Sequence, residues 1–477
     1  MKTIFEKHKE GSSNYTFPEF EYEVEIPEEY KRKIPLNLVE VPENEVVRHY
    51  IKLSQKNYGV DIGFYPLGSC TMKYNPKINE ELSRLPGFTH LHPHTPEKLA
   101  QGALEVMYEL QEILKELTGM DAATLQPSAG AQGELTGILI IKAYLKDKGQ
   151  GHRDEVLIPD SAHGTNPATA SMAGFKAVEV KSDKDGLLSV EDLKGKLSDR
   201  TVGLMITNPN TLGLYERRIR EICDLVHKAG GQVYMDGANF NALMGWIKPG
   251  DTGVDVIHLN LHKTFSVPHG GGGPGAGALL VKGHLKDYLP VPVVEKSENG
   301  YYFNWDLPKS IGKVHTFYGH FLAFIRAYAY ILSMGSEGLR KAAGDAVLNA
   351  NYLKHLLEKD FKVAYPSVCM HEFVITAKPI KDETGVRALD IAKRILDYGM
   401  HAPTVYFPLI VPEALMIEPT ETETKETLED FAKIMKKIKE EAYNDPEKVK
   451  NAPYNTPVRR LDEAKAAKEL KVSFFEG

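Results

Sequence analysis

The sequence is poor in cysteine, and this limits the kinds of protein it can encode. Its three cysteines, Cys70, Cys223 and Cys369, are odd in number and far apart. They therefore predict neither a disulfide framework nor a cysteine metal site. Free thiols are typical of a reducing compartment, so we expect a cytoplasmic protein in which Cys70 is a partly buried free thiol.

Three further features are missing from the chain. The net charge of −7 provides no basic excess for binding nucleic acid. No apolar run approaches the ~20 residues of a membrane-spanning helix. The first residues lack the apolar core of a signal peptide. We therefore expect a protein that neither binds nucleic acid nor enters a membrane.

The remaining composition is that of a large globular protein. The 477 residues are 42% hydrophobic and 26% charged, which suffices for two or three domains. Residues 1–90 are punctuated by proline and show little periodicity, so they predict an extended N-terminal arm with short helices. Residues 91–335 predict a large domain. The helix-rich residues 336–477 predict a smaller α+β domain and tail. Its expected helices cover 338–357 and 388–396, and its expected short strands lie near 361–364 and 371–376.

Apolar strands and helical patterns alternate in the large domain. Continuous apolar strands separated by helices are typical of an α/β protein with a mostly parallel sheet that is covered on both faces. The first long helix is expected at 97–117, with Gly119 as its stop. The predicted strands cover residues 156–159, 177–180, 202–207, 232–235, 256–261 and 278–281.

Polar side chains follow four of these strands, in segments 160–166, 208–211, 236–239 and 262–263. Ligands of open α/β sheets gather at the carboxyl ends of the strands. We therefore expect the four segments to form one shared site.

Lys263 is the most informative residue of this predicted site. It follows an apolar strand and precedes the glycine-rich run 270–277, which we expect to be a tight loop with positive φ angles. A buried lysine can lose its proton and form a Schiff base with a carbonyl, such as that of pyridoxal 5'-phosphate (PLP). Asp236 ends another apolar strand, where a carboxylate can charge-balance the pyridine nitrogen of PLP.

Two more segments suit the same cofactor. His163 follows the strand at 156–159, and a neutral imidazole there can stack on the cofactor ring. Small residues at 126–133 precede an apolar helical run, where backbone N–H groups can hold a phosphate or Ser128 can simply cap the helix. No Gly-Lys-Ser/Thr follows, so this segment is not a P-loop.

Three other patterns favour ordinary structure. The glycines at 270–275 formally match G-x-G-x-x-G, but a strand rather than a helix follows them, which argues against a dinucleotide site. The alternating histidines at 90–94 lack supporting carboxylates or cysteines, so we expect no metal. The acidic segment 418–423 is interpreted as a charged turn that caps the final helix, predicted at 427–443.

Taken together, these motifs resemble the glycine cleavage system P-protein family. The matching segments are collinear from about residue 60 to 425, which makes the resemblance specific. They are 68–76, 126–134, 163–168, 235–239, 255–277, 401–404 and 418–421.

The resemblance implies a PLP-dependent fold of type I, the aspartate-aminotransferase type. It implies that Lys263 binds PLP as a Schiff base, that Asp236 assists the ring in storing electrons, and that His163 stacks on the ring. Glycine would lose its carboxylate as CO2, and its aminomethyl group would pass to the lipoyl disulfide of the H-protein. It also implies that Ser128 and the backbone amides of Ala129, Gly130, Ala131 and Gln132 hold the phosphate. Further polar cofactor contacts implied are Asn208, facing the phenolic oxygen, Thr211, His262 and Thr264.

The resemblance also implies an assembly. Many members of the family are about twice as long, and this chain resembles their lysine-bearing C-terminal half, which is subunit 2 of the split form. A lysine-less subunit 1 and an α2β2 heterotetramer are then expected. Segments 68–73 and 90–94 are expected to line the substrate channel.

Two alternatives remain open at this stage. Another fold type I enzyme, such as a cysteine desulfurase or an amino-acid decarboxylase, shares the His-Lys pair and the upstream aspartate. A non-catalytic subunit that only supports its partner is the second alternative, although the presence of Lys263 and Asp236 argues against it.

Overall fold

The computed structural model describes residues 1–12, 21–22, 25–34, 36, 38–273 and 275–475. Contacts divide the chain into two units, Met1–Gly59 and Val60–Gly477. The described part of the first unit contains the 3-10 helices η1 (Phe5–Lys7) and η2 (Glu28–Tyr30) and the helix α1 (Glu43–Ser54). All elements described below belong to the second unit. The division predicted at residues 90 and 335 stays a prediction.

A seven-stranded sheet forms the centre of the second unit, with strand order β1-β7-β6-β5-β4-β2-β3. Only β7 runs antiparallel to its neighbours, and the other pairs are parallel. The predicted mostly parallel sheet is therefore confirmed. The strands are β1 (Ala122–Thr124), β2 (Glu155–Pro159), β3 (Lys176–Val180), β4 (Thr201–Thr207), β5 (Gln232–Gly237), β6 (Val256–Asn260) and β7 (Gly277–Val281).

Hydrophobic cores cover both faces of this sheet. Successive side chains of a strand point to opposite faces, so Val233 and Met235 of β5 pack on one side and Tyr234 on the other. The helices α4 (Gln101–Thr118), α7 (Val190–Lys196) and α8 (Ile219–Lys228) contribute to the first core, and α5 (Gly130–Asp147) and α6 (Thr165–Met172) contribute to the second.

The first long helix begins later than its pattern predicts. Residues Glu97–Leu99 form the 3-10 helix η3, and Ala100 (φ −116°, ψ 20°) separates it from α4. The predicted stop is confirmed, because Gly119 adopts φ +70° after the last turn. A left-handed residue at this position is the usual glycine end of a helix.

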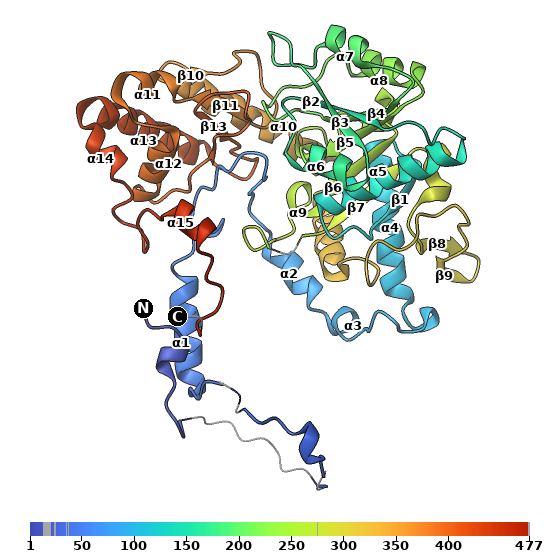
Figure 1. Ribbon diagram of the computed structural model, residues 1–477, viewed down its shortest axis with the longest axis horizontal. Coiled ribbons are helices and arrows are strands. Elements are labelled where there is room, and N and C mark those ends of the chain that lie inside the picture. The colour runs from blue at the N-terminus through green and yellow to red at the C-terminus, as the bar shows by residue number, and fades with distance from the viewer. Residues whose placement is uncertain (13–20, 23–24, 35, 37, 274, 476–477) are drawn as a thin grey trace. The chain divides into compact units, whose positions relative to one another are not determined.

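A second, smaller sheet of four antiparallel strands follows, in the order β10-β11-β13-β12 (Figure 1). The pattern predicted the first two of these strands and missed the other two. The strands are β10 (Lys362–Val363), β11 (Phe373–Thr376), β12 (Thr404–Val405) and β13 (Ala414–Ile417). Their helices are α11 (Lys378–Thr384), α12 (Ala388–Asp397), α13 (Lys425–Asn444) and α14 (Pro446–Lys450).

The helix α10 (Phe321–Leu357) links the two sheets. Gly335, with φ 61° and ψ 179°, interrupts its helical geometry. Residues before the middle of the helix, such as Phe324, pack in the core of the large sheet. Leu353 and Leu357 near its end pack in the core of the small sheet. The pattern predicted only the second half, 338–357.

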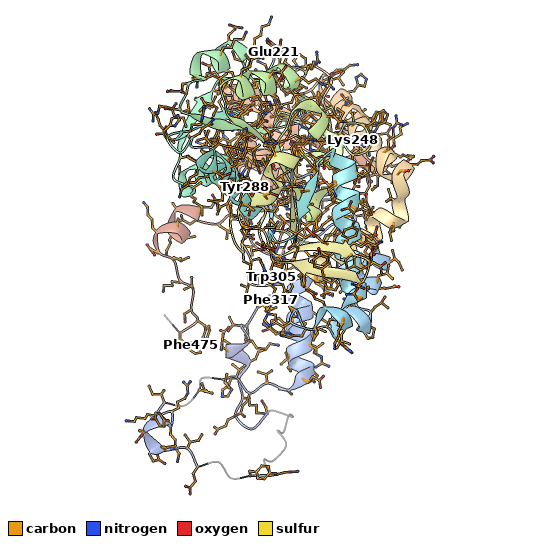
Figure 2. The ribbon with its side chains drawn as sticks, turned by 90° about the vertical axis from the view of Figure 1, so that its right-hand side faces the viewer. Glu221, Lys248, Tyr288, Trp305, Phe317 and Phe475 are labelled. Atoms are coloured by element: carbon orange, nitrogen blue, oxygen red, sulfur yellow. The ribbon has the colours of Figure 1, made fainter. Side chains whose placement is uncertain are left out.

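The hairpin of β8 (Val293–Ser297) and β9 (Gly300–Asn304) was not predicted. Trp305 and Phe317 follow it in the chain and are 52% and 38% exposed (Figure 2). No helix in the described ranges is both long and apolar enough to cross a membrane. The remaining helices are α2 (Lys77–Ser83), α3 (Pro86–Thr89), α9 (Leu261–Thr264), α15 (Glu463–Lys468), η4 (Phe240–Ala242), η5 (Pro249–Thr252) and η6 (Gly283–Tyr288).

Candidate active site

The carboxyl ends of the central strands meet at a cavity of about 590 Å³. Most of the predicted site residues line it, as expected for parallel strands that end at one edge of a sheet. Ser128, Gln132 and Asn208 are not among its lining residues. The predicted residues that do line it are Ala129, Gly130, Ala131, His163, Thr211, Asp236, His262 and Lys263.

Lys263 lies one element beyond its predicted position. The strand β6 ends at Asn260, and Lys263 is the third residue of the single-turn helix α9. Its side chain is half-buried and borders the cavity. Among the described residues, Nζ of Lys263 has no hydrogen-bond partner. The amine is therefore available to a ligand of the cavity.

Asp236 is a buried carboxylate within β5. Its Oδ1 accepts a hydrogen bond of 2.9 Å from the Ala238 amide, and Asn166 Nδ2 lies 3.4 Å from Oδ2. Burial opposes ionisation, but the His258 ring, the Ala238 amide and Lys263 together hold the pKa of Asp236 below its ordinary value. Asp236 is thus negatively charged at neutral pH.

His258 lies beside Asp236 on the neighbouring strand β6, and sequence reasoning missed it. The two residues are register partners, and His258 Nε2 lies 3.5 Å from Asp236 Oδ1 and 2.9 Å from Asn260 Oδ1. Both of these atoms are acceptors, so Nε2 carries the proton and Nδ1 accepts from the Tyr234 hydroxyl. Burial lowers the pKa of His258, which keeps the ring neutral.

Glu134, on α5, is a second acid of the site that sequence reasoning missed. Its carboxylate accepts hydrogen bonds from Thr165 Oγ1 at 2.9 Å and Asn166 Nδ2 at 2.8 Å. Burial and the neighbouring Asp236 raise the pKa of Glu134 to about 7. The available signal was an acidic residue inside an otherwise apolar helical run, since a glutamate is rarely buried unless its carboxylate has polar partners.

Glu134 orients His163 through Thr165. The Thr165 hydroxyl donates to Glu134 at 2.9 Å and lies 2.8 Å from His163 Nδ1, which accepts a 3.2 Å hydrogen bond from the Thr165 amide. Burial lowers the pKa of His163, so the ring is neutral. The ring also makes an edge contact with Phe407, with centroids 5.6 Å apart. A fixed, neutral imidazole at the cavity wall suits the predicted stacking role, which stays a prediction.

The N-terminus of α5 borders the cavity closely. Among the described residues, the Gly130 and Ala131 amides have no hydrogen-bond acceptor, as expected for the first turn of a helix. A Cβ atom at Gly130 would lie 2.6 Å from Asn260 Nδ2, so a larger residue does not fit. Ser128 Oγ and its amide both donate to Gln132 Oε1, at 2.8 and 2.6 Å.

Three predicted polar contacts already have protein partners. Thr211 Oγ1 donates to Ser161 O at 2.5 Å, and His262 Nδ1 lies 3.1 Å from Ala276 O. Burial and Lys263 lower the pKa of His262 to about 4. Asn208 Oδ1 accepts from the Glu216 amide at 2.9 Å, away from the cavity lining. The proposed contact of Asn208 with a cofactor stays a prediction.

The interpretation of 418–423 as a simple charged turn is wrong. Glu418 is fully buried and accepts 2.6 and 3.0 Å hydrogen bonds from the Thr71 hydroxyl and amide. Burial raises the pKa of Glu418 to about 7. Glu421 pairs with the buried Lys73 at 2.7 Å. The capping residue of α13 lies just after this segment, because it is Thr424 Oγ1 that accepts from the Thr427 amide at the start of the helix.

One group of side chains could in principle hold a metal. Single ligand atoms of His371, Glu372 and Glu418 lie within 4.8 Å of one another. The two carboxylates, however, already accept hydrogen bonds from Ser69 and Thr71. The predicted absence of a metal stays a prediction.

The two segments predicted to line the substrate channel, 68–73 and 90–94, border different cavities. Gly68, Ser69 and Cys70 line the cavity of Lys263. Cys70 is half-buried, as expected, and burial raises the pKa of its thiol. His92 instead borders a separate cavity of about 90 Å³ beside Phe317. The role of both segments in a substrate channel stays a prediction.

Solved structures share this fold at low sequence identity. Glycine decarboxylase (P-protein) of the glycine cleavage system, in inhibitor-bound form, aligns with a TM-score of 0.74 and 21% identity over 87% of this chain and 93% of that chain. Glutamate decarboxylase of Lactobacillus brevis aligns with a TM-score of 0.65 and 14% identity, covering 93% and 98%. The chain therefore has the fold of the type I PLP-dependent enzymes.

Sequence comparison narrows this class to one family. The family profile of the glycine cleavage system P-protein matches residues 19–300, and that of the glycine dehydrogenase C-terminal domain matches residues 342–460. A probable glycine dehydrogenase (decarboxylating) subunit 2 from Caldanaerobacter subterraneus is 59% identical over 98% of this chain and 97% of its own length. The corresponding protein of Pyrococcus abyssi is 58% identical, covering 98% and 94%. The chain belongs to the glycine cleavage system P-protein family, among its subunit 2 chains, and the resemblance predicted above is confirmed.

Proposed function

We propose that this chain uses PLP to decarboxylate glycine and passes the aminomethyl group to the lipoyl arm of an H-protein. Membership of the subunit 2 family supports this reaction. The observation that carries it is the unpartnered Lys263 amine in one cavity with the ionised Asp236. Those are the two groups that a PLP enzyme of this fold needs from its strand ends.

The residues of the cavity fit PLP. The free amides of the first turn of α5 suit a phosphate, which binds well at the positive end of a helix. Thr207 Oγ1 and Asn239 Oδ1 are buried atoms in cavity-lining residues and have no hydrogen-bond partner among the described residues. Buried polar atoms are nearly always hydrogen-bonded, so these two favour a polar ligand.

Each side chain around the bound cofactor would then have its own role. When bound, PLP supplies the electron sink for the decarboxylation. Lys263 Nζ is the amine that can hold the cofactor covalently and can carry a proton next to it. Asp236, kept charged by its surroundings, can hold a proton on the pyridine nitrogen. His163 and His258 are both neutral and therefore add no competing positive charge.

The same proposal includes partners and a compartment. Relatives named subunit 2 support a companion subunit 1, and we propose an α2β2 heterotetramer that receives a lipoylated H-protein. The three free thiols are consistent with a reducing, cytoplasmic location.

The test is the exchange of labelled bicarbonate into the carboxyl group of glycine, with both subunits, PLP and H-protein present. We expect Lys263→Ala to abolish this exchange, because no second lysine lines the cavity in the part of the chain that the structure describes. Lys248→Ala is the control, since Lys248 forms an exposed ion pair with Glu116, and it should exchange at the wild-type rate. Exchange by the Lys263→Ala enzyme would contradict the mechanism and would favour a supporting role for this subunit.

A further inference from the structure

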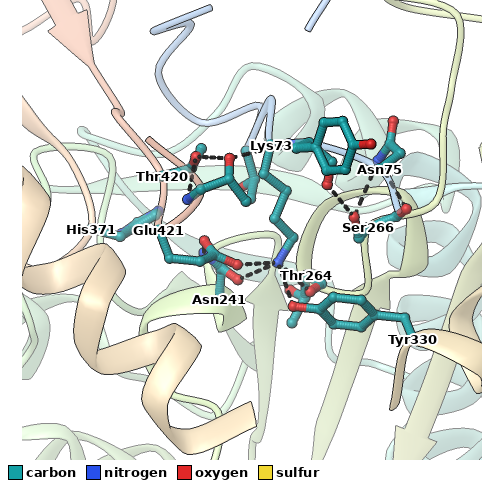
Figure 3. Close-up of polar contacts among 12 residues, drawn as sticks. Lys73, Asn75, Asn241, Thr264, Ser266, Tyr330, His371, Thr420 and Glu421 are labelled. Carbon is teal, nitrogen blue, oxygen red and sulfur yellow. Dashed lines mark hydrogen bonds and ion pairs between the residues drawn. The ribbon is translucent and has the colours of Figure 1, made fainter. Parts of the chain in front are cut away.

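Lys73 is a charged residue that is almost completely buried, only 2% exposed, and it does not line the cavity. Its ammonium donates three short hydrogen bonds, to Glu421 Oε1 at 2.7 Å, Thr264 O at 2.7 Å and Asn241 Oδ1 at 2.9 Å (Figure 3). An ammonium has three protons, so each of them has an acceptor. The Tyr330 hydroxyl lies further away, at 3.4 Å.

The acceptors of Lys73 are themselves connected. Asn241 Nδ2 donates to Glu421 Oε2 at 3.1 Å, which closes a ring of three side chains (Figure 3). Burial alone would lower the pKa of Lys73, but Glu421 and Tyr330 raise it above its ordinary value. The Lys73 ammonium therefore stays charged. Breaking a buried ion pair from one side is costly because it leaves an uncompensated charge.

The contact with Thr264 O reaches the residue next to Lys263. It is one of several contacts between 73–75 and 264–266, since Asn75 Nδ2 donates to Ser266 O at 2.9 Å and Ser266 Oγ donates to Tyr74 O at 2.7 Å (Figure 3). Ser266 has a φ of +58°, which a serine keeps only when its surroundings hold it.

The helix that carries Lys263 needs such support. The helix α9 has only four residues, and a single turn is not stable by itself. Asn241 belongs to η4, which follows β5 and Asp236. The ring of Lys73, Asn241 and Glu421 therefore touches both of the segments that follow the proposed PLP-binding residues.

We infer that Lys73 is a positioning residue, whose ammonium is held by Glu421 and Asn241 and fixes the end of α9 so that the Lys263 amine faces the cavity. This inference rests on the proposed function, because it assigns Lys73 a role through the PLP-binding amine. Lys73 does not touch substrate or cofactor itself. Glu421 acts with it as the counterion that allows the ammonium to be buried.

The test must distinguish a loss of positioning at α9 from the cost of leaving one charge buried without its partner. Lys73→Met alone leaves Glu421 without its partner and can prevent folding. The double variant Lys73→Met/Glu421→Gln contains neither charge, and its glutamine can still hydrogen-bond with Asn241. It therefore removes the donor to Thr264 O without leaving a buried charge. Tyr330→Phe is the matched control, because it removes a neighbour of Lys73 and keeps all three short bonds.

Two measurements on the full subunit pair then report on Lys263. The first is the rate at which added PLP becomes linked to Lys263, followed by borohydride reduction at set times, peptide mass spectrometry and the visible absorption of the loaded protein. The second is amide hydrogen exchange of residues 261–267 in the PLP-free protein. In the double variant we expect covalent uptake to slow by about tenfold or more and exchange at 261–267 to accelerate. Exchange within β4 should not change.

The outcomes are distinguishable from failure of the proposed function. If wild type itself shows no borohydride-fixed PLP at Lys263, the proposed function fails. The positioning role is overturned if wild type links PLP to Lys263 and the folded double variant shows the same rate of uptake and the same hydrogen exchange at 261–267. Asn75→Ala gives an independent variant without any change of charge, because it removes the amide donor that contacts Ser266 O at 2.9 Å and Ser266 Oγ at 3.3 Å. It should slow covalent uptake in the same direction, and wild-type behaviour would also overturn the inference.

Discussion

Two polar regions involve the neighbouring residues Lys263 and Thr264 of α9, and they differ in how many of their polar groups have hydrogen-bond partners. In the cavity, Lys263 Nζ, Thr207 Oγ1 and Asn239 Oδ1 have no partner among the described residues. At Lys73 every ammonium proton has an acceptor within 2.9 Å. An unsatisfied buried polar group costs about 1–3 kcal/mol, so a polar ligand of the cavity would supply hydrogen-bond partners that Thr207 and Asn239 lack.

Two neighbouring residues of α9 illustrate this difference. Lys263 and Thr264 are neighbours in the chain, yet one offers a free amine and the other is held by Lys73. The cavity therefore does not need to satisfy its own groups to keep its shape. In this inference the contacts of Lys73 hold α9 in place. The following predictions test the difference between the Lys73 region and the cavity.

The largest expected effect is on stability, from Lys73→Met alone. Removing one partner of a buried ion pair typically costs about 3–5 kcal/mol, and we expect a loss of this size in the free energy of unfolding, measured by chemical denaturation. Lys77→Met is the control from the same segment, because the Lys77–Asp61 pair is 57% exposed on both sides. A loss no larger than that of the control would remove the contrast between the two regions.

The next effect is a pH dependence that comes from Glu134. Its pKa is raised to about 7 in the folded chain, so the unfolded chain releases this proton first as the pH rises, and the folded state loses stability between about pH 4.5 and 7. Glu134→Gln lacks this titration. Relative to wild type, its free energy of unfolding should rise by about 2–3 kcal/mol from pH 4.5 to pH 8. A difference that stays constant with pH would show that Glu134 is already ionised.

A smaller effect is expected at the edge of the cavity. The new methyl group of Gly130→Ala would lie too close to Asn260, and overpacking of this kind costs about 1–3 kcal/mol. We expect PLP to bind about tenfold more weakly, measured by titration of the visible absorption. Gly102→Ala on α4 meets no atom within 4 Å and should bind PLP as wild type does. Equal affinities would place the phosphate elsewhere.

The smallest effect is a difference in thiol reactivity. Cys70 borders the cavity and is half-buried, whereas burial raises the pKa of both Cys223 and Cys369 to about 12. A maleimide should therefore modify Cys70 first, and bound PLP should slow this reaction, as followed by peptide mass spectrometry. If PLP leaves the rate at Cys70 unchanged, the cofactor does not fill this part of the cavity.

Much of the central sheet was predictable, because its strands are buried on both faces. β4, for example, is buried at all seven residues, which makes it a continuous apolar run in the sequence. The hairpin β8–β9 is only partly buried, so its residues give no comparable signal. β13 was missed for a different reason, since it is short and its partner β11 lies about forty residues earlier in the chain.

The site was predictable to the extent that it depends on strand ends. Asp236, His163 and Lys263 each follow or end an apolar run, and parallel topology brings such positions together. Glu134 and His258 were hidden, because each lies inside an element that reads as apolar. The short step from strand to helix before Lys263 was also missed, since one helical turn has no periodicity to detect.

The sequence by itself determined the α/β class, the strand-end cluster around Lys263 and the family to which the chain belongs. These properties depend on local patterns and collinear motifs, which are present in the unfolded chain. Only the tertiary structure decided which groups are left free and which are satisfied. Lys73 and Glu421 are 348 residues apart in the chain, and no local pattern reports that a lysine in one loop neutralises a glutamate in another. Burial and charge pairing are properties of the packed chain, and they determine that Lys263 has a free amine beside a residue that is firmly held.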